Sequence, residues 1–190
     1  VSPSNSRFIY KEGKYLLGKT EENSSNYDIL LFARRDIEEA IIPSNIKIIS
    51  SYSFEKCTNL RRIEISPESQ LKIIERNSFS ETNIETIFIP STVLKICENA
   101  FYGCMNLRKV DILTESQLQT IESNAFVSTK IESIHIPSTV SKIGKSAFYF
   151  CENLQIIEFS EGSMLPSIDS SFFEDCPEFI AMIPHKFRIL

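Results

Sequence analysis

Four of the five cysteines each lie three residues after a phenylalanine, so they occupy equivalent places in the chain. Thiolates bind soft metal ions and pair as disulfides, and a regular spacing of this kind could build either array. The fifth, Cys97, lies outside the pattern and could act as a nucleophile only beside a base. The four regularly placed cysteines are Cys57, Cys104, Cys151 and Cys176.

His135 is one of only two histidines and could be a general base if a neighbouring acid oriented it. Asp111 and Glu158 are the candidates, but we find no Ser, Cys or Thr nucleophile placed with this histidine. The sequence has no glycine-rich phosphate loop, no CxxC and no HExxH. We therefore expect no enzymatic activity, no cofactor and no metal site.

The elements that position these side chains are repeats. The dipeptide Ile-Pro recurs every 47 residues, and a variant unit lies inside each 47. Each unit contains a strand pattern that ends in an apolar residue. These final residues are spaced 23 or 24 residues apart along the chain, which gives six units. They are Ile42, Ile65, Ile89, Ile112, Ile136, Phe159 and Ile183.

Within each unit the last apolar positions alternate with a period of two, which predicts a strand. Each unit also holds a Phe with an Ile five residues before it, and in most units a small residue just before that Phe, as at Ala100. The small residue favours a single helical or 3₁₀ turn packed on the core. Because one unit of about 23 residues cannot bury its apolar side alone, the pattern predicts a solenoid of stacked coils with a parallel β-sheet face. The composition agrees, since 28 Ile against 13 Leu favour strands.

Coils stacked about 4.8 Å apart limit which of the cysteines can form disulfides. Cys57, Cys104 and Cys151 lie two coils apart, too far to bridge. Cys151 and Cys176 occupy adjacent coils, at a distance that permits a bond, although side chains that point the same way disfavour it. We expect buried free thiols here. Cys97 follows an in-pointing Ile in a solvated row, so we expect an exposed, incidental thiol.

The outward positions of the predicted strands form rows across the sheet. One row contains Arg62, Lys109 and Ile156, and the next contains Phe88, Asp111 and His135. Exposed apolar side chains on a polar face are typical of anchors in protein interfaces. These six residues are therefore our candidate protein-binding residues.

The first 36 residues lack the repeat. Residues 8–17 predict a β-hairpin around Gly13, and residues 29–32 predict a further strand. We interpret residues 1–36 as an N-terminal β cap and residues 37–190 as the repeats, with Pro184 to Leu190 beginning a truncated seventh coil. Asn23 lies in the one N-x-[ST] sequon, the sequence signal for a glycan acceptor.

A net charge of −5 disfavours a generic nucleic-acid binder. The longest apolar run, residues 29–33, is far shorter than a membrane span. Residue 1 is Val and no leader is visible, so we expect any signal peptide or membrane anchor to lie outside this fragment, and no membrane insertion by it.

The unit Ile-Pro-Ser-Thr-Val-x-x-Ile-x-x-x-Ala-Phe-x-x-Cys-x-x-Leu-x-x-Val-x-Ile at residues 89–112 resembles the BspA-like leucine-rich repeats. The variant at residues 79–90 is similar to the forms in surface antigens of mucosal protist parasites. The resemblance implies an α/β repeat fold, a leucine-rich-repeat solenoid. The sequence departs from the family pattern at Thr82 and Thr129, which replace the family Cys, and in the irregular strand at residues 178–183.

The resemblance also implies a role at the cell surface or in secretion. We expect a non-enzymatic recognition or adhesion module that binds a host, matrix or cell-surface protein. Two alternatives stay open, a passive spacer or antigenic coat and an intracellular scaffold, and five unpaired thiols would suit the latter.

Overall fold

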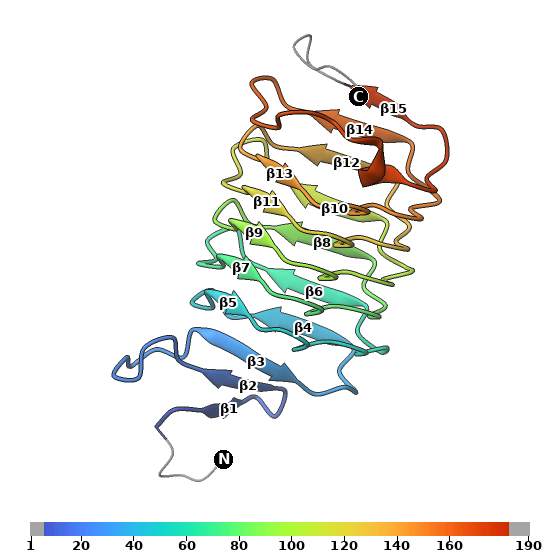
Figure 1. Ribbon diagram of the computed structural model, residues 1–190. Coiled ribbons are helices and arrows are strands. Elements are labelled where there is room, and N and C mark those ends of the chain that lie inside the picture. Colours follow the sequence, from blue (N-terminus) through green and yellow to red (C-terminus); the bar gives the residue numbers. More distant parts are fainter. Residues whose placement is uncertain (1–5, 183–190) are drawn as a thin grey trace.

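The computed structural model describes residues 6–182, which form a single stack of coils with the N-terminus at one end and the C-terminal strand at the other (Figure 1). Each coil has three sides: a long strand, a short strand and a series of tight turns. We call these the long-strand side, the short-strand side and the turn side. The predicted solenoid is thus confirmed, while the beginning of a seventh coil at Pro184 lies outside the described residues.

The long strands are parallel and nearly identical in length because each repeat supplies the same alternating pattern. In every one from β4 to β14 the second and fourth residues are buried and the others face outward. Hydrogen bonding divides the expected single sheet into a pair, β4–β6, and a five-stranded sheet from β8 to β15. The strands are β4 (Glu39–Ile42), β6 (Arg62–Ile65), β8 (Thr86–Ile89), β10 (Lys109–Ile112), β12 (Ser133–Ile136), β14 (Ile156–Phe159) and β15 (Ile180–Met182).

The short strands have two residues each, of which the second is the buried Ile expected from the repeat. They continue without a break into the N-terminal strands, giving one eight-stranded sheet. The short strands are β5 (Ile48–Ile49), β7 (Ile73–Ile74), β9 (Lys95–Ile96), β11 (Thr120–Ile121) and β13 (Lys142–Ile143).

Three strands at the N-terminal end, which we call the cap strands, complete this sheet: β1 (Ile9–Lys11), β2 (Tyr15–Gly18) and β3 (Ile29–Ala33). The hairpin expected around Gly13 joins β1 to β2, and β3 pairs in parallel with β5. Tyr15 reaches over the first coil, where its ring meets Phe54 edge-on at 6.4 Å and its hydroxyl accepts a hydrogen bond from the Ile41 N–H at 3.0 Å. The cap strands therefore shield the apolar end of the stack.

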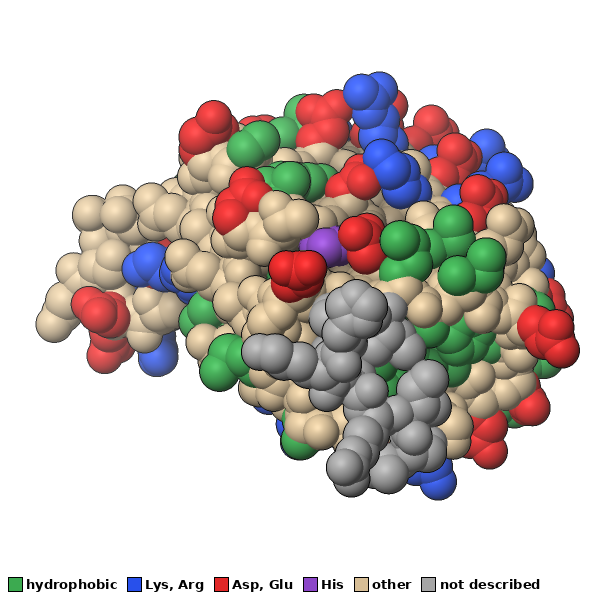
Figure 2. Space-filling model, turned by 90° about the horizontal axis from the view of Figure 1, so that it is seen from above, with side chains coloured by type: hydrophobic (Ala, Val, Ile, Leu, Met, Phe, Trp, Pro, Cys, Tyr) green, Lys and Arg blue, Asp and Glu red, His purple; other side chains and the backbone are tan. Residues whose placement is uncertain are grey.

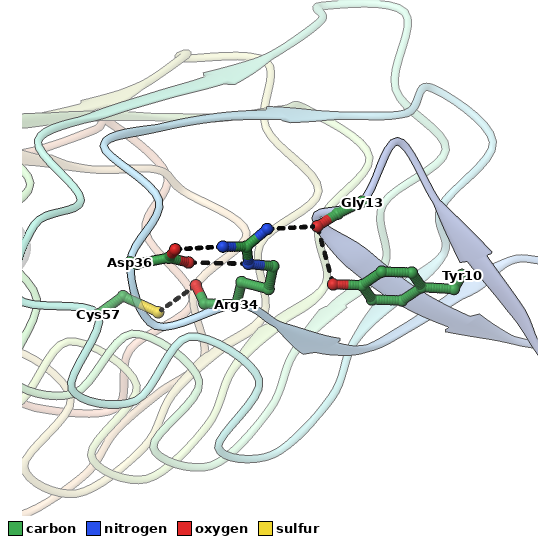
Figure 3. A network of polar contacts seen from close by, with 5 residues as sticks. All are labelled: Tyr10, Gly13, Arg34, Asp36 and Cys57. Atoms are coloured by element: carbon green, nitrogen blue, oxygen red, sulfur yellow. Dashed lines mark hydrogen bonds and ion pairs between the residues drawn. The ribbon is translucent and has the colours of Figure 1, made fainter. Parts of the chain in front are cut away.

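A polar network holds the cap strands to the first coil (Figure 3). The Arg34 guanidinium pairs with Asp36 and also donates to the Gly13 carbonyl at 3.4 Å, which accepts from the Tyr10 hydroxyl at 2.8 Å. The Cys57 thiol donates to the Arg34 carbonyl at 3.5 Å. The turn of the hairpin is thus tied to the side of the stack where the first coil begins.

The turn side is built around a column of stacked phenylalanines with ring centroids 4.9–5.4 Å apart. Backbone N–H groups on each coil donate to carbonyls of the next, as from Phe101 to Ala125 at 2.8 Å. The expected helical turns are absent from residues 6–182 except for one 3₁₀ helix at Ser170–Phe173. In the other coils, left-handed residues two positions before and after the Phe, such as Asn99 and Gly103, fold the chain into tighter turns. The Phe column is Phe54, Phe79, Phe101, Phe126, Phe148 and Phe173.

The small residue before the Phe is Ser in two coils and Ala in the next three. The hydroxyls of Ser53 and Ser78 are buried without a hydrogen-bond partner. Because an unpartnered buried hydroxyl costs about 1 kcal/mol or more, we expect Ser78→Ala to stabilise the fold by about 1 kcal/mol, measured by urea unfolding. The reverse change, Ala125→Ser, should destabilise it by a similar amount. A Ser78→Ala variant that unfolds more readily than the natural chain would contradict this account.

Candidate functional site

The structure places all six candidate binding residues on the outside of the long-strand side. Lys109 lies beside Ser133, which lies beside Ile156, and this row ends at Ile180. In the next row Phe88 lies beside Asp111, and His135 lies beside Glu158. The two rows anticipated from the repeat spacing are present in this register.

The charged candidates are paired within their own strands. Arg62 contacts Glu64 at 3.0 Å, and Lys109 contacts Asp111 at 2.8 Å. Residues two apart on a strand share a face, so each strand carries its own counter-ion. Exposed pairs of this kind contribute little free energy. These charges give the middle of the face a neutral, hydrated surface.

Phe88 differs from the expectation of an exposed anchor, since it is only partly exposed. It lies between the coils that carry Glu64 and Asp111. Its apolar area is consequently smaller than the sequence suggested.

His135 does have a hydroxyl beside it, contrary to the expectation that no nucleophile accompanies this histidine. The Ser160 Oγ lies 3.0 Å from His135 Nε2, and Glu158 Oε2 lies 3.3 Å from Nδ1. The order Ser–His–acid is that of a hydrolase, but such catalysis also needs a dry pocket with aimed oxyanion donors. The Glu158 side chain is 55% exposed on an open strand surface, so water competes for each of these contacts. We interpret the chain of contacts as fixing the imidazole on the sheet.

An apolar cluster lies at the C-terminal end of the long-strand side. Ile156 is 40% exposed, Ile180 is 68% exposed and Met182 is 54% exposed. Pairing of β14 with β15 sets Ile180 beside Ile156 and Met182 beside Glu158. We call these three residues the apolar end cluster. Viewed from this end of the stack, hydrophobic side chains gather near a histidine flanked by acidic groups (Figure 2).

Sequence reasoning missed Ile180 and Met182 because the last unit departs from the strand pattern. One signal could have found them. Ile180 follows Ile156 by 24 residues, which is one coil step, so the two belong to the same outward row.

A charged cleft of about 320 Å³ lies where the short-strand side meets the turns. Lys95 Nζ contacts Glu122 at 2.7 Å, and Glu122 also accepts from the Glu98 N–H at 3.0 Å. Cys97 lines this cleft, half-buried rather than exposed as expected. Burial, with a smaller contribution from Glu122 and Glu75, raises the pKa of Cys97 to about 11. The thiol is therefore protonated at neutral pH and is a poor nucleophile.

The other four cysteines are free thiols, as expected. Cys57, Cys104 and Cys151 are buried, but Cys176 is partly exposed rather than buried. No group of three His, Cys, Asp or Glu side chains within residues 6–182 is arranged to hold a metal ion. Over the same range, 6–182, no helix has the length and hydropathy needed to cross a membrane. Asn23 lies exposed in the loop between β2 and β3, and its glycosylation stays a prediction.

Comparison with known proteins agrees with this architecture. The family model described as BspA type leucine rich repeat region matches six copies, over residues 28–155 and 72–188. No curated protein matches the chain.

Several solved structures share the fold. The pneumococcal vaccine antigen PcpA is 19% identical with a TM-score of 0.62, covering 82% of this chain and 50% of its own. A leucine-rich repeat protein from Bacteroides capillosus is 21% identical with a TM-score of 0.51, covering 80% of this chain and 98% of its own. The leucine-rich repeat protein of T. pallidum is 16% identical with a TM-score of 0.51, covering 91% and 85%. This chain thus spans half the length of PcpA.

Proposed function

The chain belongs to the family of BspA-type leucine-rich repeat proteins, and on that basis we propose that it is a non-enzymatic recognition module that binds a protein at a cell surface. Leucine-rich repeat families are generally scaffolds for protein interaction. The proposed binding surface is the long-strand side, and the proposed partner is a host, matrix or other cell-surface protein. The fold neighbour PcpA, described as a vaccine antigen, supports a surface location.

The observation that carries the proposal is the apolar end cluster. Three large apolar side chains are exposed together at the C-terminal end of the long-strand side, where Met182 lies beside the charged Glu158. Apolar anchors surrounded by polar groups are the pattern that protein interfaces use, because excluding water from the anchors supplies most of the binding free energy. His135, held by Ser160 and Glu158, adds an oriented polar group at the rim of the cluster.

The parts of the long-strand side contribute unequally. Arg62 and Lys109 are already paired within their strands, so we expect them to affect association rate and salt dependence more than affinity. The apolar end cluster exposes carbon atoms that a partner would bury, so we expect it to set the dissociation rate.

The test measures binding of the fluorescently labelled chain to cultured mucosal epithelial cells. We expect saturable binding that weakens at least about tenfold in an Ile156→Ser, Met182→Ser double variant, since each truncated anchor costs on the order of 1 kcal/mol or more. Met105→Ser is the matched control, because Met105 is 64% exposed on the turn side. It should bind like the natural chain, and circular dichroism should show that all variants fold.

Two results would overturn the proposal. Binding that does not saturate would favour the passive spacer or antigenic coat. Saturable binding that Met105→Ser weakens as much as the double variant would move the binding surface away from the long-strand side. Antibody labelling of source cells before and after permeabilisation separates the surface role from an intracellular scaffold, which the free thiols would suit.

A further inference from the structure

The inside of the turn side carries a column of small polar side chains, one per coil. Beyond the first coil, each thiol in it donates to the carbonyl of a Phe one coil back: Cys104 to Phe79 at 3.0 Å, and Cys151 to Phe126 at 3.2 Å. Cys176 makes the same bond to the Phe148 carbonyl at 3.0 Å and therefore occupies the same kind of place. We call this set the Cys/Thr column; its members are Cys57, Thr82, Cys104, Thr129, Cys151 and Cys176.

Neighbouring members of the Cys/Thr column are in contact. Thr82 Oγ1 lies 3.3 Å from Cys104 Sγ, and Thr129 Oγ1 lies 3.3 Å from Cys151 Sγ. Along the column Cys and Thr alternate until the last step, where Cys176 replaces the Thr that the alternation would supply. Two sulfurs consequently occupy adjacent places of the column, each thiol donating to the Phe carbonyl one coil back, and the two thiols interact with each other.

We propose that Cys151 and Cys176 form an oxidative modification site, at which a low-molecular-weight disulfide such as oxidised glutathione converts the two thiols into a disulfide bridge. The Cys176 thiolate attacks one glutathione sulfur, and the S–S bond of glutathione breaks to release one glutathione thiol. The Cys151 thiolate then attacks the mixed disulfide and releases the second. Two electrons and two protons pass from the protein to glutathione.

Exposure and charge set the order of attack. Cys176 is partly exposed, whereas Cys151 is fully buried, so a dissolved disulfide meets Cys176 first. The interaction with the Cys151 side chain lowers the pKa of Cys176 and thereby favours its thiolate. The same interaction, together with burial, raises the pKa of Cys151, which then acts as the resolving thiol.

Bridging requires the sulfurs of Cys151 and Cys176 to approach to about 2.05 Å, although both side chains point the same way. The coil that carries Cys176 is held less firmly in the stack than the coils before it. The preceding coils each have a two-residue short strand, but here Ile168 forms only an isolated bridge, followed by the 3₁₀ helix at Ser170–Phe173. With fewer sheet hydrogen bonds to break, this coil can shift toward its neighbour.

The bridge would clamp the last described coil to the rest of the stack. Ile180 and Met182 follow Cys176 by four and six residues, so the clamp would also order the apolar end cluster. This consequence for binding rests on the proposed function, whereas bridge formation itself does not.

The experiment incubates the folded chain with oxidised or reduced glutathione and maps its disulfides by peptide mass spectrometry. We expect two of the five thiols to disappear, in a peptide pair that joins Cys151 to Cys176, and the thermal midpoint to rise by about 5 °C. Cys176→Thr, which extends the Cys–Thr alternation by one coil, is the matched control and should show neither change.

Five thiols surviving oxidised glutathione would overturn the proposal, as would an adduct at Cys97 with Cys151 and Cys176 both free. A thermal shift of equal size in Cys176→Thr would overturn the clamp. Because the bridge is detected by mapping, loss of cell binding in the earlier test would leave this result unaffected.

Discussion

Phe101→Ala should destabilise the chain by about 4 kcal/mol, the largest effect we expect from a single substitution. Phe101 is fully buried, and its ring stacks between Phe79 at 5.3 Å and Phe126 at 5.2 Å. Truncation would remove the apolar contacts of the ring and leave a cavity that backbone hydrogen bonds on both sides keep from collapsing. Urea unfolding followed by circular dichroism measures the loss.

The position of Phe101 in the stack adds a second expectation. In a solenoid each coil contacts only its neighbours, so weakening a central coil uncouples the two ends. We expect the urea transition of Phe101→Ala to broaden or to divide into two steps. Tyr102→Ala is the control, because Tyr102 is adjacent but 42% exposed, and it should cost less than about 1 kcal/mol. Equal midpoints for the two variants would show that the Phe column does not hold the stack together.

The interior of this protein could be predicted well from its sequence because every coil repeats the same physical problem. Ile96 and Phe101 are buried at positions that the repeat spacing identifies, and their equivalents in the other coils follow. Few other residue types fit a buried position that is stacked between copies of the same side chain, so the repeat pattern in the sequence is strong. The alternating exposure of the long strands follows from the same periodicity.

The surface could be predicted less well because it depends on contacts between coils that differ. Ser160 meets His135 only because the turn after β14 brings the end of one strand alongside the preceding coil. The conformation of the turns was also hard to predict from the sequence. Lys56 and Glu81 adopt the left-handed backbone that Gly103 adopts in the next coil, so the position is not marked by a glycine in every coil.

In the cap strands, too, some features could be predicted from the sequence and others could not. The turn at Gly13 and a strand over residues 29–32 are predicted from the sequence, but the ion pair between the buried Asp28 and the half-exposed Lys47 is not. Asp28, 2% exposed, accepts hydrogen bonds from the Thr20 N–H at 2.8 Å and the Thr20 hydroxyl at 2.7 Å. Lys47 Nζ, on the first coil, lies 3.0 Å from the same carboxylate. Such partners lie 8 and 19 residues away along the chain, with no periodicity to connect them.

Asp28→Asn should therefore destabilise the chain by about 2 kcal/mol, since hydrogen bonds to a charged group are each worth more than neutral ones and Lys47 loses its counter-ion. Burial raises the pKa of Asp28, but the hydrogen bonds from Thr20 and the contact with Lys47 outweigh it, so the pKa lies below its ordinary value of 3.8. A carboxylate with a depressed pKa in the folded state stabilises the fold above the unfolded pKa. That contribution is lost as the pH falls through the folded pKa.

The expected pH profile follows from this sign. The difference in urea stability between the natural chain and Asp28→Asn should be constant above about pH 5 and should shrink as the pH falls below about 4. Comparing the two chains removes the contribution of the other carboxylates, which titrate in both. Asp36→Asn is the control, because Asp36 pairs with Arg34 on the exposed surface, where screening makes such pairs weak. A difference for Asp28→Asn that persists undiminished at pH 2.5 would show that the charge of Asp28 plays no part in holding the cap strands to the first coil.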